Sequence, residues 1–409
     1  MRNKNHQFIS ELTIYAAIII ALNSAAPWYI WHNQWLTKAL LCLFLIGRFF
    51  ISRTHCTKSE QAALICCIFL YTYLFWIHSA DLSTIFTTTF TKILPVLFII
   101  LFTNDEKAKF IKRFTAIFSG IGLLSLIFYL LWGIGFPLPH TTIYHNNSFY
   151  PEFTNYYLFV TMAKEYTPMI RFSGIFTEPG HLGTYTAILI YINRYNFRKW
   201  SVWVMTIMLF LSLSVAGYLL FGLGLMLLLW STKNNFIKLV LISITCILFI
   251  SIIGTHLIEK YDNSVLTKLI FSRLVIENGE MSGNNRNTYD FEVAYDNFKH
   301  TNSIIVGIGR NKFNSLPFVI AGGNCSYKNY IFQYGIIGLI LIIIFGISLI
   351  IPKTSKIYWG LFIIYCVSFI QRPFALDEIQ LFPFICFQQG MLLDRFKHVK
   401  NINHTRITE

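Results

Sequence analysis

Long, nearly continuous apolar runs alternate with short polar segments along this chain. The runs Leu123–Leu131 and Ile336–Ile351 contain no charged residue and do not alternate between apolar and polar positions as the strands of a membrane barrel do. A helix pairs its own backbone polar groups, and about 20 apolar residues are enough to cross a bilayer. The pattern therefore predicts membrane-spanning α-helices.

The predicted spans cover most of the chain. We predict an all-α, polytopic integral membrane protein of about twelve transmembrane helices, forming a single transmembrane helical domain over residues 1–409. The stretch Ser201–Trp230 is too long for one span and barely long enough for two, so Ser212–Gly217 is interpreted as a tight break within it. The predicted spans are 12–31, 36–52, 60–79, 83–103, 113–136, 179–194, 198–213, 215–232, 236–254, 328–351, 356–372 and 376–394.

The composition agrees with lipid as the solvent for most of the chain. Of the 409 residues, 13% are charged, against about 25% in a typical soluble domain. A formal net charge of +14 would suggest nucleic acid in a soluble protein, but membrane proteins gather lysine and arginine on cytoplasmic segments. We therefore expect membrane lipids, and no nucleic acid, as partners.

The distribution of basic residues predicts the orientation. With the N-terminus in the cytoplasm, every segment on the inner side carries lysine or arginine, whereas the short outer turns 32–35, 80–82 and 373–375 carry none. The interpretation is a multi-pass protein of the bacterial inner membrane with both termini in the cytoplasm.

This orientation leaves two long loops on the periplasmic side, 137–178 and 255–327. Within the second loop, apolar residues at i, i+3, i+4 and i+7 predict a short amphipathic helix. Such a helix could lie on the membrane surface or cap the bundle. The residues are Phe291, Ala294, Tyr295 and Phe298.

The cysteines form neither a metal-binding nor a disulfide pattern. Most of the 8 cysteines lie in apolar runs, where they act as small hydrophobic residues, and only Cys325 is clearly on the outer side. One thiol cannot form an internal disulfide, and no Cys-x-x-Cys pair occurs. We therefore expect no disulfide framework, no metal site and no cofactor.

Both long loops carry arginines despite their outer position. Arginine grips phosphate through two parallel hydrogen bonds, so these residues predict a binding site for a phosphate- or diphosphate-linked lipid. The alternative is a solvated loop surface, which is the commoner fate of charged loop residues. The arginines are Arg171, Arg273, Arg286 and Arg310.

The end of the first loop, Arg171–Gly183, combines a cation, a carboxylate, an imidazole and several glycines. Pro179 suits the first turn of a helix, and Glu178 just before it lies at the positive end of the helix dipole. A helix cap and a turn would explain Glu178, but would leave Arg171 and His181 without a role. Glu178 and His181 are therefore the candidate bases for an acceptor hydroxyl.

Further polar features stand next to or inside predicted spans. Gly307–Arg310 and the segment with Lys328 and Asn329 lead into a span that carries several glycines. Lys92 lies in the middle of span 83–103, where an ionised group indicates function by default. The alternatives for Lys92 are a partner carboxylate or an incorrectly placed span.

Four short stretches resemble the O-antigen polymerase and O-antigen ligase superfamily. The number of predicted spans and the two long periplasmic loops are also similar to that family. The stretches are Arg171–Gly183, Ser282–Arg286, Gly307–Gly309 and Tyr327–Gly338.

The resemblance implies a glycosyltransferase whose donor is an oligosaccharide linked to undecaprenyl diphosphate. A polymerase transfers the growing chain onto a second lipid-linked repeat unit, with a chain-length regulator and a flippase as expected partners. A ligase transfers the finished chain onto lipid A–core. The resemblance also implies that Arg171, Arg286 and Arg310 hold the diphosphate or an anionic glycan, whereas Lys328 and Asn329 stand where ligases commonly have His-Asn.

We interpret the chain as a metal-independent polymerase. Glycosyl transfer passes through an oxocarbenium-like state, and in the absence of an Asp-x-Asp motif arginines would neutralise the charge that develops on the diphosphate. The spacing from Arg171 to Gly183 departs by one residue from the polymerase pattern, so a ligase of the same superfamily stays the nearest alternative. A flippase for lipid-linked oligosaccharide is the alternative from another class, although transporters usually show internal repeats and short loops. A non-enzymatic assembly factor would leave the outer arginines and glycines without a role.

Overall fold

A computed structural model describes most of the chain. The predicted spans 36–52 and 236–254 lie largely or wholly outside the described residues, as do Arg273 and Arg286. The described residues are 2–24, 45–46, 56–78, 81–144, 152–162, 171–232, 276–277, 280–281, 287–320, 326–351 and 355–390.

The described part is mostly helical, and 4 of its helical segments are long and apolar enough to cross a membrane. Helices of this composition are those of a membrane-embedded protein, because a helix is the element that satisfies its own backbone in lipid. The long segments are Lys58–Ile77, Leu82–Ile100, Asn104–Gly133 and Tyr327–Ser348, and the shorter apolar helices are Gln7–Asn23, Trp200–Leu211, Val215–Ser231 and Lys356–Ile370.

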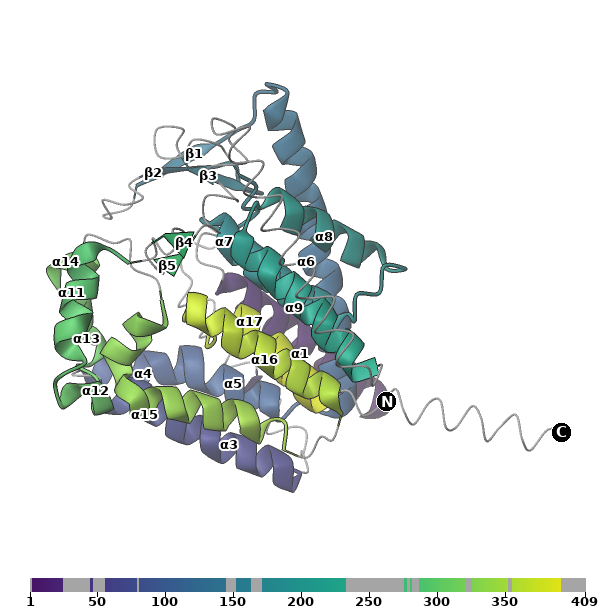
Figure 1. The fold of residues 1–409 in the computed structure, drawn as a ribbon. Coiled ribbons are helices and arrows are strands. Elements are labelled where there is room, and N and C mark those ends of the chain that lie inside the picture. The colour runs from purple at the N-terminus through teal and green to yellow at the C-terminus, as the bar shows by residue number, and fades with distance from the viewer. Residues whose placement is uncertain are drawn as a thin grey trace.

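Figure 1 shows how the helices are arranged around α17, with α11 to α14 gathered at one end of α15. The segments η1 and η2 are π-helical turns inside longer helices. The helices are α1 (Arg2–Asn23), α3 (Lys58–Tyr71), η1 (Thr72–Ile77), α4 (Leu82–Thr88), η2 (Thr89–Ile93), α5 (Leu94–Ile100), α6 (Asn104–Gly133), α7 (Pro179–Ile192), α8 (Trp200–Leu211), α9 (Val215–Thr232), α11 (Tyr289–Phe298), α12 (Ser303–Val306), α13 (Arg310–Asn314), α14 (Pro317–Ile320), α15 (Tyr327–Ser348), α16 (Lys356–Gln371) and α17 (Glu378–Gly390).

Helix α17 is the centre of the bundle, and all of its residues are buried. It packs against α1, α5, α6 and α7. Its buried amides need hydrogen-bond partners: Gln380 Nε2 donates to Ser368 Oγ at 3.0 Å, and Gln388 Nε2 donates to Tyr358 O at 2.9 Å. These two glutamines of α17 are therefore held by α16.

The long loops contain short antiparallel strands, which the all-α prediction omits. Thr154 pairs with Thr142 on one side and with Thr161 on the other, so part of the first loop folds as a three-stranded sheet. Val160 N donates to Gly174 O at 2.9 Å, which joins this sheet to the segment before α7. The strands are β1 (Thr141–Tyr144), β2 (Glu152–Asn155), β3 (Val160–Met162) and, in the second loop, the pair β4 (Ile276–Glu277) and β5 (Glu280–Met281).

Helix α15 is interrupted at Gly335, whose φ of 66° and ψ of −173° are not helical. The loop after α12 docks beside this interruption: Ile308 N donates to Phe332 O at 3.0 Å, and Gly309 N donates to Gln333 O at 2.9 Å. Irregular backbone inside a membrane needs such partners, because lipid offers none. The interruption thereby fixes the position of the loop that leads into α13.

Helix α11 covers the residues of the predicted amphipathic helix and packs against the first half of α15. The ring of Phe298 stacks on Phe332 with centroids 4.2 Å apart, and Phe291 is fully buried in the same cluster. The apolar face predicted for this helix therefore packs against α15.

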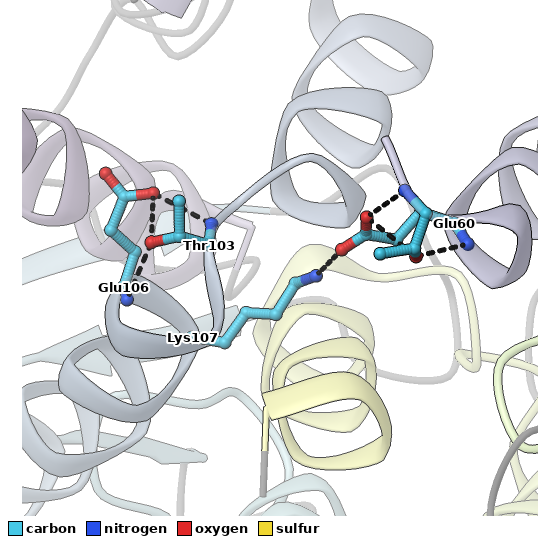
Figure 2. A network of polar contacts seen from close by, with 5 residues as sticks. Glu60, Thr103, Glu106 and Lys107 are labelled. Atoms are coloured by element: carbon cyan, nitrogen blue, oxygen red, sulfur yellow. Dashed lines mark hydrogen bonds and ion pairs between the residues drawn. The ribbon is translucent and has the colours of Figure 1, made fainter. Parts of the chain in front are cut away.

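The starts of α3 and α6 are joined by a polar network (Figure 2). Each helix begins with a capping box, formed by Thr57 with Glu60 in α3 and by Thr103 with Glu106 in α6. Lys107, whose side chain is 0% exposed, places Nζ 2.8 Å from Glu60 Oε1. The second carboxylate oxygen of Glu60 accepts a hydrogen bond from Thr57 N in the capping box. Glu60 therefore both caps the start of α3 and pairs with the buried ammonium group of Lys107 in α6.

Candidate functional site

Charged side chains gather where α7 begins and where α16 turns into α17. They come from segments far apart in the chain. We call this group the α7–α17 cluster; its members are Lys92, Glu178, His181, Arg372, Asp377 and Glu378.

Glu178 forms an ion pair with Arg372 at the start of α7. The Glu178 Oε2 atom lies 2.6 Å from Arg372 Nη2, and the side chains are 25% and 8% exposed respectively. Pro179 starts the helix, and the guanidinium lies directly over Gly180, where a Cβ atom would be 2.3 Å from Nη2. The absence of a side chain at Gly180 therefore lets Arg372 reach the first turn of α7.

The turn between α16 and α17 contacts α7 at further points. The His181 ring meets the Phe374 ring edge-on with centroids 4.8 Å apart, and one helical turn later Tyr185 Oη donates to Asp377 Oδ2 at 3.4 Å. Within the turn, Phe374 N donates to Arg372 O at 2.8 Å, and Asp377 N donates to Phe374 O at 3.0 Å. The turn is therefore compact, and its residues contact one side of α7.

Glu378, the first residue of α17, forms the second ion pair of the cluster. Its carboxylate is 0% exposed, and its Oε1 atom lies 3.1 Å from Nζ of Lys92, a side chain that is 29% exposed. Lys92 belongs to η2, and π-helical turns frequently occur at functional sites. Glu378 is thus the partner carboxylate that is one of the alternatives for Lys92. Lys92 in turn provides the compensating charge that a buried carboxylate requires. The functional role of Lys92 stays a prediction.

Arg310 lies within electrostatic range of the cluster. It is exposed as the first residue of α13, directly after Gly309, and its charge acts on both Lys92 and Tyr334. A Cβ atom at Gly309 would be 3.5 Å from Nδ1 of His78. Burial lowers the pKa of His78 below the ordinary value for histidine, so this imidazole is neutral at neutral pH.

Arg171 faces a different part of the bundle. Its Nη1 atom donates to Leu213 O at 3.4 Å, which places the guanidinium at the turn between α8 and α9, and its charge also acts on Tyr218 of α9. Arg171 thus lies beside α7, next to the turn predicted at 212–217.

Lys328 and Asn329 lie at the start of α15. Lys328 forms an ion pair with Glu292 of α11, and its Nζ atom lies 5.3 Å from the centroid of the Tyr295 ring. Asn329 N donates to Ser326 O at 3.0 Å in the first turn of the helix. These contacts attach α11 to α15. Arg273 and Arg286 lie outside the described residues, so their predicted roles are not addressed by the structure.

Arg372, Asp377 and Glu378 are not singled out by the sequence pattern, because they lie at the ends of the predicted spans 356–372 and 376–394, where charged residues are ordinary. A signal was nevertheless present in the segment 372–378. The predicted orientation places this turn on the outer side, where an arginine next to a short loop departs from the distribution of basic residues.

The cluster combines cations with groups that can accept a proton. Guanidinium and ammonium groups bind phosphate oxygens, whereas carboxylates accept hydrogen bonds and protons, and an imidazole can donate or accept. Among the described residues, no group of three or more His, Cys, Asp or Glu side chains is placed to hold a metal ion. The arrangement is suited to binding an anionic group next to a proton acceptor.

Comparison with known proteins adds no family assignment: no protein-family model, curated protein or solved structure matches the chain.

Proposed function

We propose that this chain is a glycosyltransferase of the bacterial inner membrane that polymerises lipid-linked oligosaccharide repeat units. Its donor is an oligosaccharide on undecaprenyl diphosphate, and its acceptor is the sugar of a second lipid-linked repeat unit. The resemblance of four short stretches to the O-antigen polymerase and ligase superfamily motivates the reaction class. The observation that carries the proposal is the α7–α17 cluster, which brings cations and proton acceptors together next to an apolar bundle.

The proposed topology has about twelve spans, both termini in the cytoplasm and the two long loops in the periplasm. In that orientation the start of α7 and the turn 372–377 both face the periplasm, where lipid-linked glycans are assembled into polymer. The basic residues of α6, such as Lys107 and Lys109, then lie on the cytoplasmic side, where they pair with Glu60 and Glu11.

The roles of the cluster follow from charge. Arg372 is suited to neutralise the diphosphate that leaves the anomeric carbon, an electrostatic contribution that is large in a site shielded from water. Arg310, whose charge acts on Lys92, is a second cation for this role. Glu178 and His181 are the candidate bases for the acceptor hydroxyl. Lys92 compensates the charge of the buried Glu378.

A transporter for lipid-linked oligosaccharide is the second candidate, and a specific observation favours it. Transporters often carry interrupted helices and buried charges near the middle of the membrane, and here α15 is interrupted at Gly335 while Lys92 pairs with Glu378 inside the bundle. The backbone before Gly335 accepts hydrogen bonds from a loop of the same chain, which is a reason to prefer an enzyme with a fixed site.

A glycan ladder from cells tests the proposal. The gene is deleted and then restored, and the glycans attached to lipid A–core are separated by length. A single repeat unit on lipid A–core after deletion would support a polymerase. Loss of all attached glycan, with polymer accumulating on undecaprenyl diphosphate, would indicate the ligase instead. An unchanged ladder would refute both enzymes.

A further inference from the structure

We propose that donor binding opens the Glu178–Arg372 ion pair: the diphosphate of the donor replaces the Glu178 carboxylate on Arg372, and the released carboxylate then accepts the proton of the acceptor hydroxyl. This inference rests on the proposed function and deepens it. It assigns Arg372 to the donor diphosphate, and it assigns the proton transfer to Glu178 rather than to His181.

The two members of the pair differ in how firmly they are held. Arg372 is 8% exposed and lies over Gly180, whereas Glu178 is 25% exposed and precedes the helix in an extended conformation. The cation is therefore the fixed member, and the carboxylate is the one that can swing outward. The other pair of the cluster differs, because there the carboxylate is the buried member: the side chain of Glu378 is 0% exposed, and that of Lys92 is 29% exposed.

A diphosphate is the stronger competitor for Arg372. It carries more negative charge than a carboxylate and offers more acceptor oxygens to the fork of a guanidinium. Since Arg372 lies over the first turn of α7, a diphosphate bound there would also meet the positive end of that helix. Both effects favour exchange of the carboxylate for the diphosphate.

The exchange couples donor binding to base activation. The oxygen of the acceptor hydroxyl forms a bond to the anomeric carbon of the donor, and the bond from that carbon to the diphosphate oxygen breaks. The electron pair leaves with the diphosphate, next to Arg372, and the hydroxyl proton passes to the Glu178 carboxylate. In the absence of donor, Glu178 stays paired and does not act as a base.

The test measures binding and transfer separately on the full chain in detergent. Binding of farnesyl diphosphate, a short prenyl diphosphate, is compared in the original chain and in Glu178→Gln, Arg372→Gln and Gly180→Ala, and transfer between lipid-linked repeat units is measured on the same samples. Asp296→Asn is the matched control, because Asp296 forms an exposed ion pair with Lys299 at 2.7 Å in the second loop.

Glu178→Gln removes the competing charge, so farnesyl diphosphate should bind about two- to fivefold tighter, while transfer is lost. Arg372→Gln should weaken binding by about tenfold or more. Gly180→Ala keeps every charge but places a Cβ atom 2.3 Å from Arg372 Nη2, so it should weaken binding by displacing the guanidinium. Asp296→Asn should leave both measurements unchanged.

The failures of the two proposals are distinguishable. Equal or weaker binding by Glu178→Gln, or transfer that survives in that variant, would overturn the ion-pair exchange. If the original chain transfers no sugar at all, the polymerase proposal fails, whereas the order of binding affinities still decides whether Glu178 competes with diphosphate for Arg372.

Discussion

Gly335→Ala should destabilise the protein strongly, because two backbones touch at this position. A Cβ atom at Gly335 would lie 2.3 Å from Ile305 O and 2.5 Å from Ile305 C, which are backbone atoms that cannot swing away. Gly307 faces it with the same restriction, since its own Cβ atom would be 2.3 Å from Gln333 O. The loop after α12 must therefore move away from α15 to admit a methyl group.

The expected cost has two parts. A residue other than glycine at φ 66° and ψ −173° is strained by about 1–3 kcal/mol. Separating the loop from α15 also breaks the bonds from Ile308 N to Phe332 O and from Gly309 N to Gln333 O, each worth about 1 kcal/mol. The free energy of unfolding should fall by roughly 3–5 kcal/mol, a large part of the about 5–15 kcal/mol of a typical protein.

The assay is thermal and denaturant unfolding of the purified protein in detergent, followed by circular dichroism. Gly120→Ala is the control, because Gly120 lies within α6 and nothing is within 4 Å of its Cβ position. That control should be neutral or more stable by up to about 1 kcal/mol. Equal stability of Gly335→Ala and Gly120→Ala would refute the claim that α15 and the loop are in backbone contact.

Three further changes test other parts of the structure. Lys92→Met removes the cation that pairs with the buried Glu378, so the free energy of unfolding should fall by about 3–5 kcal/mol. The double variant Lys92→Met, Glu378→Met should recover most of that loss. Normal stability of Lys92→Met alone would contradict the ion pair. Thr103→Ala removes the cap of α6 and should cost about 1 kcal/mol, measured by the same unfolding assay with Thr87→Ala, at an exposed position within α4, as its control. Burial lowers the pKa of His78, so the unfolded chain binds a proton at this imidazole more readily than the folded chain does. The stability contributed by the neutral ring is therefore complete above about pH 6.5 and is lost as the pH falls. His78→Phe should therefore lose less stability between neutral and acidic pH than the original chain, and an unchanged pH profile would argue against a lowered pKa of the half-buried His78.

The helices could be predicted from the sequence where apolar runs are long. Predicted span 60–79 corresponds to the segment Lys58–Ile77, and predicted span 328–351 corresponds to Tyr327–Ser348. The break predicted within 201–230 is also present, because α8 ends at Leu211 and α9 begins at Val215. In each case the length and composition of one local segment determine the element.

Helix α6 shows where hydropathy alone falls short. The predicted span begins at 113, whereas the helix begins at Asn104, directly after the cap residue Thr103. Charged residues in its first turns shorten the apolar run, yet they are held by ion pairs, among them Lys107 with Glu60 and Arg113 with Glu11. Thr103 and Glu106 have the local Thr-x-x-Glu spacing of a capping box, whereas no local spacing indicates the distant partners of Lys107 and Arg113.

The site could be predicted only in part. The stretch that ends the first loop places Glu178 and His181 in the cluster, because a carboxylate before a proline marks a helix start. Their contacts with Arg372 and Phe374 join residues that lie far apart in the chain, and the pair of Lys92 with Glu378 spans 286 positions. No local pattern reports such pairings, which arise from the packing of α7, α17 and η2.

The most direct test of the proposed function is transfer by the purified protein in lipid vesicles. The vesicles contain undecaprenyl-diphosphate-linked repeat units with a radiolabelled sugar, and the products are separated by length. The polymerase proposal predicts lipid-linked products of two or more repeat units, formed by the original chain and absent with Arg372→Gln. Label that crosses the bilayer without any increase in length would contradict the polymerase and would identify a transporter.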